Sequence, residues 1–216
     1  MVYDDYLIRM IRQGAAVLAR IAGLKKSGDY QDALQEIHQN QELLFGMDPS
    51  LIRLSDDESL YSALSARVEG NPEQLELAAD LFIEEGDILR RQGNAEESDA
   101  AYGRALLLLL RLAGRPDSSN TAAVSKKAGD VFGRMDPAGV PSALLFDLFC
   151  HFENAGEYKK AEAVLGRLSS RPDVRMDALR ESRLFYRRML DVDPGRLSAQ
   201  GMSRKYLQGR LREIPG

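Results

Sequence analysis

Apolar residues recur every three or four positions along most of this chain, which is the spacing of one face of an α-helix. The first such stretch covers residues 4–26. Gly28 follows it, and a glycine in a left-handed conformation often ends a helix. Alternating runs of β-branched residues, which are typical of strands, are nearly absent. The pattern therefore predicts an all-α protein.

Short turns divide the apolar pattern into about ten helices. Asn71-Pro72 is typical of an N-cap followed by proline in the first helical turn, and Asp48-Pro49 indicates another start. No long linker separates the helices, so we expect a single domain over residues 1–216, with Arg115–Asn120 as the best candidate for a hinge. The predicted helices lie near 4–26, 30–45, 58–68, 72–92, 95–112, 119–135, 140–154, 158–170, 174–191 and 195–212, with a short one after Pro49.

Three of the predicted turns share one arrangement of residues. A glycine (Gly28, Gly93 or Gly156) follows one helix and precedes the next. A tight antiparallel turn needs a residue that tolerates a left-handed conformation, and glycine does. A small residue five positions later allows two helices to approach closely, and a large residue four positions further fills the groove between them. These pairs are Ala33 with Ile37, Ser98 with Tyr102, and Ala161 with Leu165.

On these residues the chain resembles the tetratricopeptide repeat. The middle segment fits the motif's spacing at Ala79, Phe82, Gly86, Leu89, Gly93-Asn94, Tyr102 and Ala105. The closest repeat matches are residues 14–45, 79–112 and 142–173. The resemblance implies an antiparallel helical-hairpin array, an α-solenoid. Basic helices over residues 174–216 follow the last of these matches.

The chain also departs from the motif, and its start carries a second resemblance. Glu85 lies where the motif prefers a leucine, and Phe149 lies where it prefers a small residue. The opening segment Tyr3–Ile11 is similar to the start of an uncharacterised bacterial family of tetratricopeptide-like proteins. That family has no assigned activity, so this second resemblance implies a fold and not a function.

Composition favours a globular protein in a reducing compartment. The hydrophobic fraction is 44%, the charged fraction 29% and the net charge -4, all ordinary values. Cys150 is the single cysteine, so no intramolecular disulfide can form. The first residues lack the basic region of a signal peptide, and the longest apolar run, Ala105–Leu110, is too short to span a bilayer. We therefore expect a cytoplasmic protein with no membrane partner.

Residues suited to catalysis or metal binding are scarce. The histidines are His38 and His151, and neither has a second histidine or cysteine at the spacing of a zinc site. Cys150 with His38 is the one nucleophile pairing to consider, and a buried cysteine on a helix packing face is the favoured interpretation. No phosphate-binding or nucleophile-elbow motif occurs. We expect no enzyme, no metal and no cofactor.

The resemblance also implies a surface for a partner. In tetratricopeptide proteins the first helix of each hairpin lines the concave face, where peptides lie. Acidic and apolar residues together suit a partner with basic and hydrophobic character. An alternative of equal weight is that these residues only pack against neighbouring hairpins. The residues placed on this face are Asp80, Ile83, Asp87, Arg90, Phe146, Cys150 and Glu153.

The C-terminal residues 174–216 differ in charge from the rest. They hold ten lysine and arginine residues against five acidic ones, a local net charge of +5. This asymmetry favours an acidic partner or head-to-tail self-association, and a polar capping helix is the alternative. Interleaved acids make nucleic acid an unlikely partner. The predicted basic patch comprises Arg183, Arg187, Arg188, Arg204 and Lys205.

The function that best fits these features is a non-catalytic protein–protein interaction or scaffold module, with a protein or peptide on the concave face. One alternative is a self-associating structural protein, for example a homodimer through the apolar stripe Leu7, Ile11, Leu18 and Leu24. Another is a sensor that holds a small molecule or peptide inside the superhelix.

Overall fold

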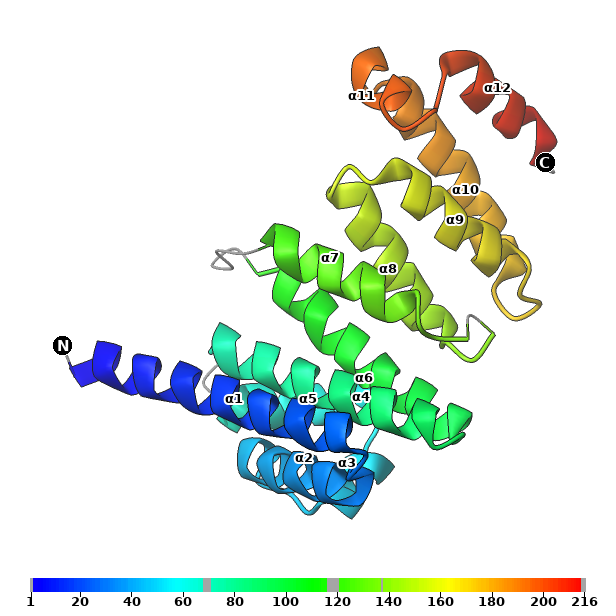
Figure 1. The fold of residues 1–216 in the computed structure, drawn as a ribbon. Helices are drawn as coiled ribbons and strands as arrows, with labels where there is room; N and C mark the ends of the chain where they lie inside the picture. The colour runs from blue at the N-terminus through cyan, green and yellow to red at the C-terminus, as the bar shows by residue number, and fades with distance from the viewer. Residues whose placement is uncertain (1, 68–70, 116–120, 137, 215–216) are drawn as a thin grey trace. The chain divides into compact units, whose positions relative to one another are not determined.

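The computed structural model describes residues 2–67, 71–115, 121–136 and 138–214. These residues form twelve α-helices and no β-strand (Figure 1). They fall into two compact units, Met1–Gly139 and Val140–Gly216. The all-α prediction is confirmed, with twelve helices in the described residues where ten or eleven were expected, while the solenoid and the single domain stay predictions. Residues 116–120 of the predicted hinge lie outside the described part of the chain.

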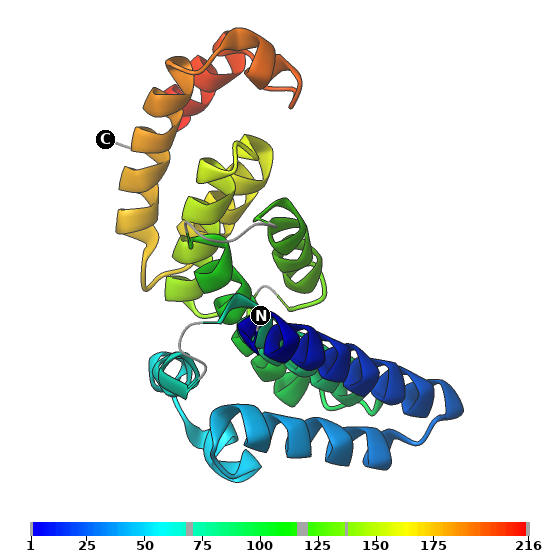
Figure 2. The ribbon, with the colours of Figure 1, turned by 90° about the vertical axis from the view of Figure 1, so that its left-hand side faces the viewer.

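Unit 1 is built around the hairpin of α5 and α6, the most extensively packed pair of helices in the unit. The helix α2 turns back after α1 and packs on both α1 and α5, and α7 packs on α6 (Figure 2). The helices of this unit are α1 (Val2–Ser27), α2 (Tyr30–Phe45), α3 (Pro49–Leu54), α4 (Asp57–Arg67), α5 (Pro72–Arg91), α6 (Ala95–Ala113) and α7 (Thr121–Phe132).

Unit 2 is a chain of neighbouring helices in which α9 packs on α8, α10 on α9, and α12 on α10. Phe149 and Phe185 meet edge to face in its core, with ring centres 5.7 Å apart. The helices are α8 (Ser142–Asn154), α9 (Tyr158–Ser169), α10 (Arg175–Leu190), α11 (Pro194–Ser198) and α12 (Arg204–Glu213).

The single helix predicted over residues 195–212 is wrong, because the chain breaks between α11 and α12. Gly201 adopts a left-handed conformation with φ of 70°. Ser203 is the N-cap of α12, and its side chain accepts a hydrogen bond from the backbone N–H of Tyr206. The buried residues Leu197, Met202 and Leu207 lie five positions apart, which is wider than the spacing of one helix face and agrees with the break.

The three predicted glycine turns have the same geometry. Gly28, Gly93 and Gly156 all lie in the left-handed region, with φ of 87°, 85° and 74°. After each glycine, a backbone N–H donates to the carbonyl five residues earlier, which is the helix-ending hydrogen bond of the Schellman motif. These bonds join Asp29 to Leu24, Asn94 to Leu89, and Glu157 to Phe152, at 2.8–2.9 Å.

Residues after the turns also pack as predicted. Ala33, Ser98 and Ala161 are completely buried, so the helices of each hairpin approach closely there. The Ser98 hydroxyl donates to the Gly86 carbonyl at 2.8 Å, which fixes the contact of α5 with α6. In the first hairpin, Leu18 and Leu24 of the apolar stripe pack against the unit 1 core. The side chains of Leu7 and Ile11 lie outside what the structure describes.

The predicted helix starts at Asp48 and Asn71 are confirmed. The Asn71 side chain accepts hydrogen bonds from the backbone N–H groups of Glu73 and Gln74, and Asp48 caps α3 in the same way. In the described residues, no helix combines the length and apolar character needed to cross a membrane.

Candidate functional site

Asp80, predicted to face a partner, is paired inside unit 1. Its Oδ1 accepts a hydrogen bond from Lys127 Nζ of α7 at 2.8 Å, and Glu76 Oε1 accepts from the same ammonium at 2.7 Å. Burial raises the pKa of Asp80 above its usual value, although the bond from Lys127 acts in the opposite direction. The charge of Asp80 is therefore already balanced by the chain itself.

Asp87 joins four segments of unit 1. Its Oδ2 lies 3.0 Å from Lys25 Nζ of α1, and its Oδ1 accepts from the Tyr102 hydroxyl at 2.7 Å and from Arg134 at 2.9 Å. Burial acts to raise the pKa of Asp87, but the hydrogen bonds from Tyr102 and Lys25 outweigh it and the pKa lies below its usual value. Burial and the Asp87 carboxylate raise the pKa of Tyr102 to about 12.

The other two predicted residues of α5 are also engaged. Ile83 is buried with 8% exposure, and Arg90 pairs with Asp99 and donates to the Arg134 carbonyl at 3.1 Å. All four residues of α5 that were predicted to bind a partner are thus either salt-bridged or buried within unit 1. These contacts favour the packing interpretation of this face, and its role in binding stays a prediction.

The three residues of unit 2 that were predicted to bind a partner differ in exposure and in their contacts. Phe146 is half-buried and Glu153 pairs with Arg188. Cys150 is exposed, so the interpretation of a buried packing cysteine is wrong. Desolvation of its thiol, and then the nearby carboxylates of Glu153 and Glu181, raise the pKa of Cys150. A reactive thiol needs the opposite, an electropositive setting that lowers its pKa.

Two residues of the predicted basic patch, Arg188 and Arg183, make hydrogen bonds within unit 2. Arg188 makes two hydrogen bonds to Glu153, at 2.7 and 2.8 Å, and another to Glu181 at 2.7 Å. Arg183 donates to the Ile214 carbonyl at 3.3 Å. The remaining members, Arg187, Arg204 and Lys205, are exposed.

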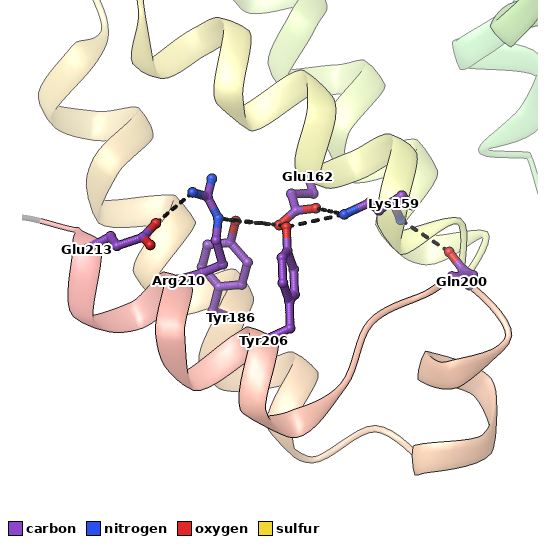
Figure 3. Close-up of polar contacts among 7 residues, drawn as sticks. All are labelled: Lys159, Glu162, Tyr186, Gln200, Tyr206, Arg210 and Glu213. Carbon is purple, nitrogen blue, oxygen red and sulfur yellow. Dashed lines mark hydrogen bonds and ion pairs between the residues drawn. The ribbon is translucent and has the colours of Figure 1, made fainter.

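A second polar group, the Glu162 cluster, consists of Lys159, Glu162, Tyr186, Tyr206 and Arg210 (Figure 3). Glu162 Oε1 accepts from the Tyr186 hydroxyl at 2.7 Å and from the Tyr206 hydroxyl at 2.6 Å. Its Oε2 accepts from Lys159 Nζ at 2.7 Å, and Arg210 Nε lies 3.7 Å from Oε1. Arg210 also donates to the Tyr186 hydroxyl at 3.1 Å. The cluster thus ties α12 to α9 and α10.

The Glu162 cluster is suited to holding helices together rather than to chemistry. Burial acts to raise the pKa of Glu162, but hydrogen bonds from Lys159, Tyr206 and Tyr186 outweigh it and the pKa lies below its usual value. Burial and the bond to Glu162 raise the pKa of both tyrosines. The carboxylate stays ionised and the phenols stay neutral near pH 7, which gives a stable network and no nucleophile.

The lowered pKa predicts how acid affects unit 2. A group whose folded pKa lies below its unfolded value stabilises the fold above the unfolded pKa, and this stability is lost as pH falls through the folded pKa. Glu162→Gln should therefore lower the free energy of unfolding by about 1–3 kcal/mol at pH 7 and much less near pH 3. Urea denaturation between pH 7 and pH 3 measures this. The exposed Asp191→Asn is the control, and an equal pH profile for both variants would contradict the prediction.

A pocket of about 380 Å³ opens between α2, α3, α5 and α6. We call it the Glu85 pocket, because Glu85 is a charged residue at its floor with only 6% exposure. Leu89 and Ala101 beside it are also buried, whereas Arg53, Gln92, Asn94 and Glu97 at the mouth are exposed. The pocket is lined by Gln31, Leu34, His38, Arg53, Glu85, Leu89, Gln92, Asn94, Glu97, Ala100, Ala101 and Arg104.

Two side chains of α2 hold the Glu85 carboxylate. Gln41 Nε2 donates to Oε2 at 2.8 Å, and His38 Nε2 lies 3.3 Å from Oε1. A buried carboxylate lowers stability relative to a well-packed apolar side chain. In the predicted tetratricopeptide register the motif prefers a leucine at this position, and Glu85 places a carboxylate there, at the floor of an open pocket.

Comparison with known proteins places the chain in a family. One family model matches residues 1–215, which include both units, the Glu85 pocket and the Glu162 cluster. The chain belongs to this family of unknown function, DUF6483. No curated protein and no solved structure matches it. The predicted resemblance to an uncharacterised family fits this result, whereas membership of the tetratricopeptide repeats stays a prediction.

Sequence reasoning missed the two groups that stand out in this DUF6483 protein. The sequence did contain a signal for the Glu85 pocket, because a carboxylate lies where the predicted repeat motif prefers a leucine. For the Glu162 cluster the signal was weaker: an acidic residue, Glu162, next to the buried Ala161 on the packing face of α9. In the described residues, no three side chains of histidine, cysteine, aspartate or glutamate come together as a metal site.

Proposed function

We propose that this DUF6483 protein is a non-catalytic binding module that holds a peptide or protein partner at the Glu85 pocket. The observation that carries the proposal is a buried carboxylate in the floor of an open pocket. Ligand pockets usually measure about 300–1,000 Å³, and 380 Å³ lies at the small end of that range. Asp80 and Asp87 of α5, which the sequence predicted to bind a partner, already form salt bridges with Lys127 and Lys25 of unit 1.

The chemistry of the lining favours binding over catalysis. Its members include no serine, threonine, cysteine, lysine or tyrosine, so the pocket wall offers no hydroxyl, thiol or amine nucleophile. Exposed amide side chains at the mouth, those of Gln92 and Asn94, can hydrogen-bond a peptide backbone. Eight of the twelve lining residues are polar or charged, and the four apolar ones are Leu34, Leu89, Ala100 and Ala101.

A tryptophan at the mouth tests the proposal. Ala100 is exposed and lines the pocket, so Ala100→Trp should fill the space without disturbing the core. We expect a partner captured from an extract of the source cells by the native chain to be reduced at least tenfold with this variant. The measurement is quantitative mass spectrometry of the captured proteins.

Ala163→Trp is the matched control, because Ala163 is exposed on α9 and far along the chain from the pocket residues. It should capture the partner as the native chain does. Equal capture by Ala100→Trp would contradict the proposal. Recovery of further copies of the chain alone would favour the self-associating alternative instead.

A further inference from the structure

The contacts of Glu85 set it apart from the other acids with low exposure. Asp80 pairs with Lys127, Asp87 with Lys25 and Arg134, and Glu162 with Lys159 and Arg210. Each of these carboxylates therefore faces a permanent cation. The polar contacts of Glu85 come instead from Gln41, which is neutral, and His38, which carries charge only when protonated.

This difference leaves Glu85 able to accept a cation from outside the chain. An ionised carboxylate has about four lone-pair sites, and the two contacts to α2 use only two of them. A buried anion is most stable when an opposite charge and further hydrogen bonds meet it. A cationic group that enters the pocket would supply both.

The walls and the mouth of the pocket limit the shape of such a cation. Leu34, Leu89 and Ala101 give an apolar lining beside the carboxylate, which suits a chain of methylene groups. At the mouth, Arg104 donates to the Arg53 carbonyl at 2.7 Å and its guanidinium lies 5.9 Å from the Phe82 ring centre, so it is held in place. Arg53 and Arg104 outnumber Glu97 at the mouth, and this excess of positive charge disfavours a second cation there.

We propose that the Glu85 pocket takes a lysine side chain of the partner, with the ammonium at Glu85 and the methylene stem along Leu34 and Leu89. This inference rests on the proposed function and names the group that is recognised. A single ammonium needs only one of the two remaining acceptor sites, whereas the arginine fork needs both of them to be free in one plane. The mouth arginines disfavour free diamines, and Gln92 and Asn94 suit a peptide backbone, so the lysine belongs to a polypeptide.

Three probes test this with the full-length protein labelled with ¹⁵N. The first is a pentapeptide with a central lysine between glycines, blocked at both ends. The second has norleucine in place of lysine, which keeps the stem and removes the ammonium. The third is free 1,5-diaminopentane. We expect the lysine peptide to shift the backbone amide resonances of pocket residues in a saturable way, with at least tenfold tighter binding than either other probe.

Variants locate the effect at Glu85. Glu85→Gln should weaken binding of the lysine peptide at least tenfold, because the amide keeps an oxygen for Gln41 but has no charge. Glu97→Gln, at the exposed mouth, should change binding less than threefold. Circular dichroism and the melting temperature confirm that both variants are folded.

The outcomes separate this inference from the proposed function. Equal binding of the norleucine peptide, tighter binding of the diamine, or binding unaffected by Glu85→Gln would overturn the lysine proposal. If the lysine peptide fails while Ala100→Trp still abolishes capture of a partner, the pocket binds a different group and the proposed function stands. If both tests fail, neither proposal survives.

Discussion

Replacing Phe149 with alanine is expected to lower the free energy of unfolding of unit 2 by about 3–5 kcal/mol, the usual cost of removing a buried aromatic ring. Phe149 is 1% exposed, and its ring packs edge to face on that of Phe185, which is fully buried. The hole left by the ring cannot close easily, because α8 and α10 are both held by their packing on α9. Native-state hydrogen exchange of the α9 and α10 amides measures the loss in this unit directly.

Phe146→Ala is the matched control for this substitution. Phe146 lies on the same helix but is half-buried, so its loss should cost less than about half as much. Equal losses for the two variants would show that the ring contact with Phe185 does not dominate the core of unit 2.

The sequence allowed the helices and three turns to be predicted because their signals are local. A helix period is set by residues three and four apart, and a left-handed turn by one glycine. Gly28, Gly93 and Gly156 therefore marked the hairpins correctly, with their helix-ending hydrogen bonds. The break at Gly201 was missed, although this glycine has the same left-handed conformation as the three that marked the hairpins.

The candidate site could not be predicted in the same way, because its contacts join residues distant in sequence. Asp87 meets Lys25 from 62 positions away and Arg134 from 47. A helical period places Asp87 on a face of α5 but does not say whether another helix covers that face. The same limit applies to Glu85, whose partner Gln41 lies 44 positions earlier on α2. What the sequence did show was the departure of Glu85 from the repeat motif.

Two glycine-to-alanine substitutions should have opposite effects on stability. Gly23 is exposed in α1 with no heavy atom within 4 Å of an added Cβ, so Gly23→Ala should stabilise the fold by about 0.5–1 kcal/mol through helix propensity. In α5, a Cβ on Gly86 would lie 2.6 Å from Cε1 and 2.7 Å from Cδ1 of Tyr102. Gly86→Ala should instead destabilise unit 1 by about 1–3 kcal/mol, the cost of overpacking.

The sign at Gly86 depends on whether the Tyr102 ring can move. Its hydroxyl is bonded to Asp87, which in turn holds Lys25 and Arg134, so a shift of the ring disturbs contacts to α1 and to the segment after α7. Urea denaturation of Gly86→Ala, Tyr102→Leu and the double variant Gly86→Ala/Tyr102→Leu decides the cause. The smaller side chain should restore part of the stability lost at Gly86, as relief of a steric clash requires. If the double variant instead shows the sum of the two single losses, the clash with Tyr102 is not what makes glycine necessary at this position.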